Sequence, residues 1–174
     1  MTIETELEQT VRSVHYSGFT YLLIVACSQR KRSDPGLLPA IERYDGVHFH
    51  VIRKAQREGY WPANLDVLIV SAKYGLLELK TAIEHYDLRM TLKQAMQIRP
   101  LVLPILAERI KSMTYAEVFL NVGKTYRVSL EGWNVGLSRD TTIVYANGGI
   151  GQRARQMRNW LIEKTKSERG PTIG

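Results

Sequence analysis

The stretch that decides the fold is YLLIVACSQRK, residues 21–31. Its first six residues are uncharged and mostly aliphatic, with β-branched members, which is typical of a buried strand in a parallel sheet. Small, polar and then cationic residues follow, from Cys27 to Lys31. Open α/β sheets bind their ligands at the carboxyl ends of strands, so this loop is the first candidate for a functional site.

Three further apolar runs have the same character, at residues 65–70, 116–122 and 141–146. Helical patterns separate them, including an amphipathic segment from Val47 to Glu58 that Gly59 ends. This alternation predicts an α/β fold, a three-layer α/β/α sandwich with a mainly parallel four-stranded sheet, in a single domain over residues 1–174. The other expected elements are an N-terminal acidic helix within residues 1–18, a short helix after Pro39, a helix over 91–113 broken near 99 by Pro100 and Pro104, helices over 124–133 and 152–166, and a flexible tail over 167–174.

The chain is basic, with 24 lysines and arginines against 17 acidic residues and a net charge of +7. This excess favours a polyanion, DNA first, as the partner; a basic surface without a specific partner is the alternative. No apolar run approaches the roughly 20 residues that span a bilayer, so we expect a cytoplasmic protein with no membrane partner. The one cysteine, Cys27, excludes an internal disulfide and a cysteine-rich metal site.

Small or polar residues follow all four predicted strands. The carboxyl ends of parallel strands share one edge of a sheet, so we expect these residues to line a single crevice. Hydrogen-bonding groups and tyrosine rings there suit a nucleobase, by bonding its edges and stacking on its faces. The candidate base-binding residues are Ser28, Gln29, Lys73, Tyr74, Asn121 and Tyr126.

The turn after the last strand is rich in glycine and precedes a helix. Unpaired amides and the helix dipole favour an anion at such a position, so Gly149, Gly151, Gln152 and Arg153 are candidate phosphate contacts. A tight turn that requires glycine is the alternative interpretation. Three more cations, Arg30, Lys31 and Arg155, complete the candidate DNA-phosphate contacts.

Two carboxylates are candidates for catalysis. Asp87 follows the second strand, where a carboxylate can act as a base or stabilise a developing cation. Asp45 is the second candidate. The alternatives are a loop cap or a partner of Arg89 for Asp87, and a turn residue for Asp45. His48 and His50 lie two residues apart without a completing ligand, so we expect no metal.

Several short motifs together resemble those of a known group of domains. The motifs are CSQRK (27–31), YDG (44–46), SAKYGLL (71–77), YD (86–87) and GIGQR (149–153). They look like a set of bacterial domains that are similar to a domain of archaeosine synthase and, in fold, to the uracil-DNA glycosylase superfamily. The resemblance covers roughly residues 20–162.

The resemblance implies an α/β/α fold whose pocket holds a base flipped out of DNA. It also implies cleavage of the N-glycosidic bond without metal or cofactor, and the similar defence proteins remove modified bases from phage DNA. The sequence has neither the Gly-Gln-Asp-Pro-Tyr nor the His-Pro-Ser-Pro loop of uracil-DNA glycosylases, so uracil is not the expected substrate.

These observations lead to a DNA glycosylase that acts on a modified or damaged base and leaves an abasic site. Two alternatives remain open. One is an enzyme that transfers or hydrolyses the deoxyribosyl group of free nucleosides or nucleotides, which would not need a basic surface. The other is a nucleic-acid-binding module without catalysis.

Overall fold

A computed structural model describes residues 21–170 of the chain. The predicted helix within residues 1–18 and the end of the predicted tail, residues 171–174, lie outside this part. The elements, in order, are β1 (Tyr21–Ala26), β2 (Leu38–Pro39), α2 (Ala40–Arg43), α3 (Val47–Glu58), β3 (Leu65–Ser71), β4 (Gly75–Glu78), β5 (Ala82–Ile83), α4 (Leu92–Ser112), β6 (Glu117–Asn121), α5 (Lys124–Ser129), β7 (Thr142–Tyr145) and α6 (Ile150–Arg169).

The central sheet has five strands in the order β4-β3-β1-β6-β7, and a small second sheet pairs β2 with β5. The parallel strands β3, β1, β6 and β7 are the four that the sequence predicts. The predicted number of strands is wrong, because β4 adds an antiparallel edge strand next to β3. The fold is therefore α/β with a mixed, mostly parallel sheet.

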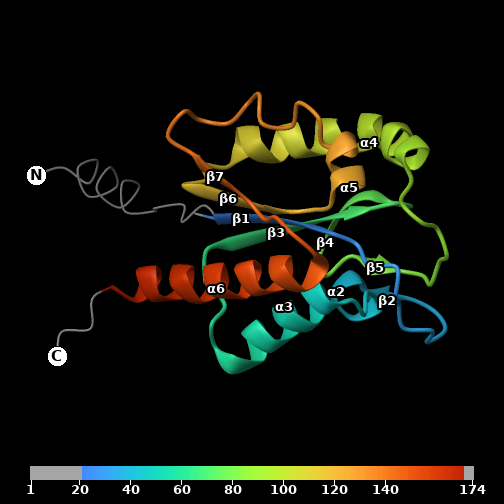
Figure 1. The fold of residues 1–174 in the computed structure, drawn as a ribbon, viewed down its shortest axis with the longest axis horizontal. Helices are drawn as coiled ribbons and strands as arrows, with labels where there is room; N and C mark the ends of the chain where they lie inside the picture. The colour runs from blue at the N-terminus through green and yellow to red at the C-terminus, as the bar shows by residue number, and fades with distance from the viewer. Residues whose placement is uncertain (1–20, 171–174) are drawn as a thin grey trace, which may run out of the picture.

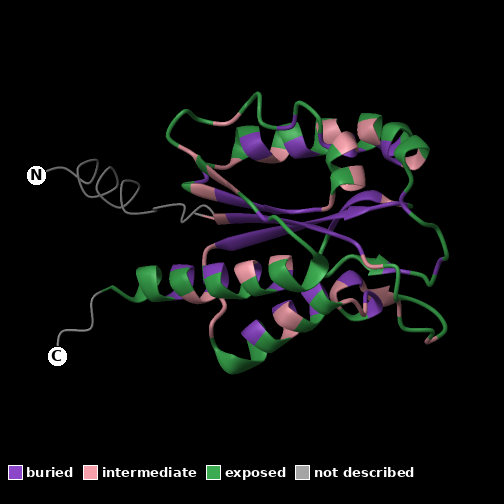
Figure 2. Ribbon diagram, in the orientation of Figure 1, coloured by how far each residue is buried: buried purple, intermediate pink, exposed green. Residues whose placement is uncertain are grey.

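Helices lie on both faces of the sheet: α4 and α5 on one, α3 and α6 on the other (Figure 1). This arrangement is consistent with the predicted three layers. Strands β1, β3 and β6 are buried along most of their length, whereas each long helix is buried along one face (Figure 2). Residues 22–25 of β1 have no exposed surface, so the apolar run at residues 21–26 forms the centre of the core.

Helix α4 is continuous, and the predicted break near residue 99 is wrong. Pro100 and Pro104 lie inside it. Each proline leaves the carbonyl four residues earlier without its usual donor. One of these carbonyls belongs to Met96, which is 66% exposed, and the other to the exposed Pro100, so both lie on the solvent side. The opposite face is apolar and packed, and this burial holds the helix together.

The last helix runs beyond the predicted boundary at residue 166. Two side chains near its end are held by the loop after α3: Glu168 accepts hydrogen bonds from the amides of Ala63 and Asn64, at 2.7 and 3.0 Å. Arg169 donates to the carbonyl of Gly59 at 2.9 Å. These contacts keep residues 167–169 helical, so this part of the predicted tail is ordered. Within residues 21–170, no helix is long and apolar enough to cross a membrane.

Candidate functional site

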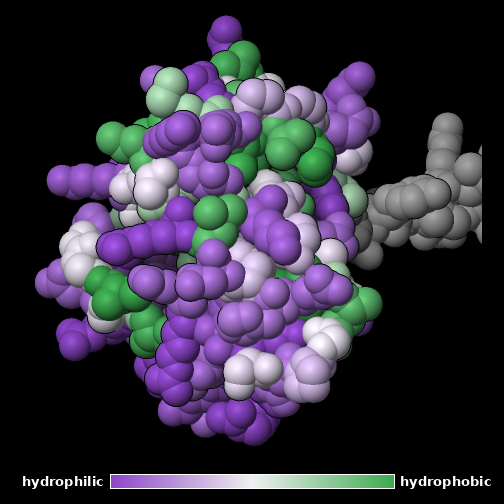
Figure 3. Space-filling view, turned by 90° about the vertical axis from the view of Figure 1, so that its right-hand side faces the viewer, coloured by the Kyte–Doolittle hydropathy of each residue, from purple (hydrophilic) through white to green (hydrophobic). Residues whose placement is uncertain are grey.

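The carboxyl ends of β1 and β6 form the candidate site. These strands are neighbours, yet the chain continues from β1 to α3 on one face and from β6 to α5 on the other (Figure 1). Loops that leave adjacent strands toward opposite faces leave a crevice between them, where open α/β sheets bind ligands. This end of the molecule has a largely hydrophilic surface (Figure 3).

Two cavities meet in this crevice. They share the wall formed by residues 27–29 and Tyr126. The first, which we call the loop cavity, has a volume of about 300 Å³ and is completed by Leu88, Arg89, Met90, Gly123, Lys124 and Thr125. The second, the helix cavity, has a volume of about 270 Å³ and is completed by Ala26, Arg30, Gly46, Val47, His48, Phe49, Ile150 and Arg153.

The loop after β1 is held in place by a buried arginine. The Arg43 side chain has no exposed surface. Its guanidinium donates to the carbonyls of Arg32, Asp34 and Gly36 at 2.7, 2.8 and 2.5 Å. Three charge-assisted hydrogen bonds to one loop fix its course. Sequence reasoning missed Arg43, because nothing in the sequence shows that a helix arginine turns inward.

Ser28 joins the loop after β1 to the start of α3. Its hydroxyl donates to the carbonyl of Arg30 at 2.5 Å and accepts from the amide of Gly46 at 3.1 Å. Because its proton is already used, Ser28 has no donor left for a base. Gln29 differs: it lines both cavities, and its side-chain amide has no hydrogen bond to any described residue.

Three buried hydroxyls form a triangle beside the crevice, which we call the tyrosine cluster: Tyr44, Ser71 and Tyr86. Tyr44 donates to Ser71 at 3.1 Å, and the hydroxyl of Tyr86 lies 2.7 Å from that of Tyr44 and 3.0 Å from that of Ser71. Burial raises the pKa of both tyrosines, so both keep their protons at neutral pH. The short motifs of the sequence contain both tyrosines, but only the fold brings them together.

Two lysines cover the tyrosine cluster. The ammonium group of Lys31 lies 4.2 Å from the ring centre of Tyr86, and that of Lys73 lies 5.6 Å from the same centre. Tyr74 packs edge-on against this ring at 5.5 Å. Partial burial lowers the pKa of Lys31, while the nearby thiol of Cys27 and carboxylate of Asp87 act in the opposite direction. The predicted residues Lys31, Lys73 and Tyr74 therefore gather around one aromatic ring, and Asp87 lies near Lys31. None of the four lines either cavity.

Cys27 lies in the wall that the cavities share. Its buried thiol is 3.2 Å from the hydroxyl of Tyr126, which also lies 3.4 Å from the Cys27 carbonyl. Burial raises the pKa of Tyr126, so this hydroxyl stays protonated. Tyr126 thus lines both cavities.

The two candidate carboxylates have different surroundings. Asp45 is 20% exposed and forms ion pairs with Arg30 at 3.0 Å and Arg53 at 3.3 Å. A ring nitrogen of His50 is within hydrogen-bond distance of it, at 2.9 Å. These partners satisfy both of its oxygens, so the carboxylate serves to hold the start of α3. Asp87 is exposed and forms no ion pair with any residue in 21–170, which leaves its oxygens available.

Asn121, predicted to contact a base, lies behind the crevice. It is fully buried, and its amide nitrogen is 3.3 Å from the sulfur of Met157 in α6. Alternate residues of a strand point to opposite faces, and Asn121 points to the α6 face. It does not line either cavity.

The glycine turn before α6 has the geometry that the sequence predicts. Gly148 has a φ of +82°, which favours glycine. The side chain of Gln152 accepts from the amide of Gly149 at 2.8 Å, so its oxygen caps its own helix. Arg153 reaches the helix cavity, whereas Arg155 is exposed on α6 and lines neither cavity.

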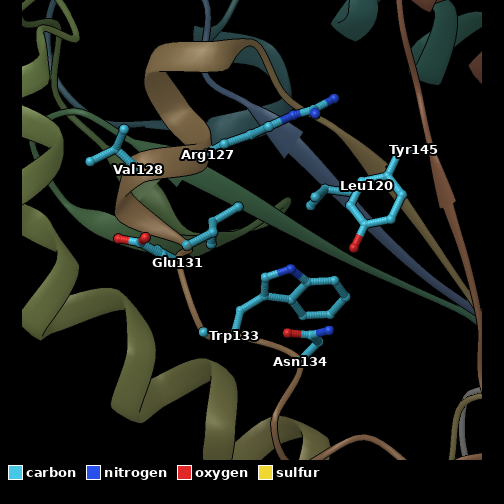
Figure 4. A pocket seen from close by; sticks show the side chains of 9 residues that line it. Leu120, Arg127, Val128, Glu131, Trp133, Asn134 and Tyr145 are labelled. Carbon is cyan, nitrogen blue, oxygen red and sulfur yellow. The ribbon is translucent and has the colours of Figure 1, made fainter.

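A third cavity, of about 380 Å³, lies between α5, β6 and β7. Trp133 and Tyr145 project into it from opposite sides (Figure 4). The guanidinium of Arg127 is 5.6 Å from the ring centre of Tyr145. None of the predicted site residues line this cavity, which lies apart from the crevice. Among residues 21–170, no group of three or more His, Cys, Asp or Glu side chains is placed to hold a metal ion.

Comparison with known proteins identifies a family whose function is unknown. No curated protein matches the chain. A crystal structure described as that of AF0587, a protein of unknown function, is similar with a TM-score of 0.46 and 13% sequence identity. The match covers 82% of this chain and 44% of that chain. Residues 22–159 match a family described as a family of unknown function, DUF6884, and the chain belongs to this family.

Proposed function

We propose that this protein is a DNA glycosylase that hydrolyses the N-glycosidic bond of a modified or damaged base. The observation that carries the proposal is the pair of adjoining cavities at the carboxyl ends of the strands. The loop cavity offers polar groups and an aromatic wall to a flipped base. The helix cavity offers cations and helix N-termini to the neighbouring phosphate. We also infer that the fold is of the uracil-DNA glycosylase type.

The base enters the loop cavity, where Gln29 has a free amide for its edge. Tyr126 closes the wall beside it, with its hydroxyl directed to Cys27. The cavity of about 300 Å³ lies at the small end of ligand pockets, which suits one base. Substituents of a modified base extend toward Lys73 and Tyr74, which lie beside the cavity at the tyrosine cluster.

Asp87 is the proposed catalytic group. The bond between C1′ and the base nitrogen breaks, and its electron pair leaves with the base. The carboxylate of Asp87 stabilises the positive charge that develops on the sugar and accepts a proton from the water whose oxygen bonds to C1′. The ammonium of Lys31 lies close enough to this carboxylate to interact with it electrostatically.

The surface charge supports DNA as the substrate. The net charge is +7, Arg30 and Arg153 line the helix cavity, and Lys31 lies close to Cys27 in the shared wall. Each phosphate contact releases counterions, so binding should weaken by orders of magnitude as salt rises from about 50 to 200 mM. An enzyme for free nucleosides would bind with little salt dependence.

The decisive experiment incubates the protein with a panel of DNAs that carry different modified bases, phage DNA included. Released base is detected by mass spectrometry and abasic sites by cleavage in alkali. Asp87→Asn should reduce the rate about 100- to 10,000-fold. Asp140→Asn, at an exposed position in the loop before β7, is the matched control and should leave the rate unchanged. DNA binding without base release from any member of the panel would refute catalysis, and release from free nucleosides alone would favour the deoxyribosyl-transfer alternative.

A further inference from the structure

The helix cavity lies between the N-terminal turns of two helices. Val47 and His48 come from the first turn of α3, and Ile150 and Arg153 from the first turn of α6. The helices have 12 and 20 residues, so both are long enough for their dipoles to act at the cavity. The first amides of each helix have no carbonyl partner within the helix.

Neither helix has an acidic residue in its first turn, and only α6 has a side-chain cap, from the neutral amide of Gln152. The N-caps are Gly46 and Gly149, which have no side chain to cover the amides. Aspartate and glutamate are usually enriched in a first turn because they complement the positive end of the dipole. Asp45 precedes the N-cap of α3, but its oxygens are already taken by other side chains. Within the described part of the chain, no acidic residue lines the cavity itself.

Two buried nitrogen atoms at this cavity have no hydrogen-bond partner. Within residues 21–170, five buried side-chain atoms lack a partner, and two of them belong to residues that line the helix cavity: Nε2 of His48 and Nη1 of Arg153. His48 is only 6% exposed. Buried polar atoms nearly always have a partner, so these two nitrogens point to a missing acceptor.

The electrostatics of the cavity favour an anion as that acceptor. Burial and the positive charge of Arg153 lower the pKa of His48 to about 4, while a backbone hydrogen bond at Ile150 acts in the opposite direction. His48 is therefore neutral at pH 7, and the tautomer that carries its proton on Nε2 can donate there. Burial and the charge of Arg127 lower the pKa of Arg153. Burial is the larger cause of both shifts and the neighbouring positive charges add to it, so a bound anion would oppose both.

We propose that the helix cavity binds a phosphate group between the N-termini of α3 and α6, with Arg153 and His48 as side-chain donors. Arg153 holds the group from the α6 side, and His48 holds it from the α3 side. The inference rests on the proposed function only for the source of the phosphate, a phosphodiester next to the flipped base. A free nucleotide would supply the same chemistry through its terminal phosphate.

The test measures binding by the full chain of three probes: inorganic phosphate, a deoxynucleoside 5′-monophosphate, and a dinucleoside phosphate with no terminal phosphate. Calorimetry gives the affinity, and NMR follows the pKa of His48, which should rise when phosphate binds. Arg153→Gln and His48→Gln should each weaken binding about tenfold or more. Arg158→Gln is the matched control, since Arg158 lies on the same helix with its guanidinium 5.7 Å from the ring centre of Tyr60.

The outcomes separate the cavity from the catalytic proposal. Folded Arg153→Gln and His48→Gln variants that bind all three probes as the wild type does would overturn the phosphate site, whatever the enzyme activity. Preference for the dinucleoside phosphate supports the site with DNA as the source, and preference for the monophosphate supports it with a free nucleotide as the source. Phosphate binding as expected, without base release from any DNA, would keep the site and refute the glycosylase.

Discussion

Replacing Gly46 with alanine tests the contact between the start of α3 and the loop after β1. An added Cβ would lie 2.5 Å from Cβ of Ser28 and 3.2 Å from its Oγ. Carbon atoms in contact are normally about 3.5–4.0 Å apart, so the overlap exceeds about 1 Å. Gly46 has a φ of −84° and a ψ of 169°, which any residue adopts, so the cost is steric and does not come from the backbone conformation.

The size of the effect follows from two contributions. Forcing an extra carbon into a packed contact costs about 1–3 kcal/mol. If Ser28 moves aside, the hydrogen bond from the Gly46 amide to its Oγ, at 3.1 Å, is lost as well, at about 1 kcal/mol. We expect Gly46→Ala to lower the free energy of unfolding by about 2–4 kcal/mol, which leaves a domain of typical stability folded.

Urea unfolding followed by tryptophan fluorescence measures this loss, and Ser28 supplies the controls. Ser28→Gly removes the atom that clashes, so in the double variant about 1–3 kcal/mol of the Gly46→Ala loss should return as coupling energy. Ser28→Ala keeps the Cβ and should give no such relief. Additive losses for Gly46→Ala and Ser28→Gly would refute the close contact.

Three further predictions concern buried charges. Arg109→Met removes the cation 3.1 Å from the buried Asp66, so the free energy of unfolding should fall by about 3–5 kcal/mol. Arg99→Met, at a more exposed ion pair, is the control and should change the free energy of unfolding by less than ~1 kcal/mol. Arg43→Met should lower it by about 2–4 kcal/mol and make the loop after β1 sensitive to protease, because three carbonyls lose their donor. The pKa of His48 is about 4 in the folded protein against 6.5 for a free histidine, so between these values only the unfolded chain binds the proton and stability falls as pH falls. The fall from pH 6.5 to 4 should be about 3 kcal/mol larger in wild type than in His48→Gln, and equal slopes would contradict the buried neutral ring.

The parallel part of the sheet could be predicted from the sequence, because a buried parallel strand is apolar on both faces. β4 could not, since Gly75–Glu78 is only four residues long and follows a turn. Its pairing depends on Ser71, whose hydroxyl accepts from the amide of Tyr74 at 3.1 Å and folds the chain back on β3. A short strand that forms because a turn places it beside the edge of a sheet needs no hydrophobic periodicity in its own sequence.

The site was predictable where it depends on strand ends and not where it depends on distant contacts. Gln29 and Tyr126 follow the ends of β1 and β6, so topology alone places them together. His48 and Arg153 lie 105 residues apart, and only the packing of α3 against α6 gives both a place in one cavity. Asn121 shows that a position at a strand end is not sufficient for this prediction, because the side chain there can point to either face of the sheet.

The loop after β1 has little freedom left for a catalytic motion of its own. Arg43 holds its outer part, Ser28 fixes it to the first turn of α3, and Asp45 pairs with Arg30. Side chains whose hydrogen bonds already hold this loop cannot bind a ligand without losing those bonds and loosening the loop. Among the described residues near the crevice, Gln29, Asp87, His48 and Arg153 keep hydrogen-bonding groups without a partner, and they come from four different segments. Under the proposed function, the ligand contacts these segments together, and the backbone after β1 is the rigid wall beside it.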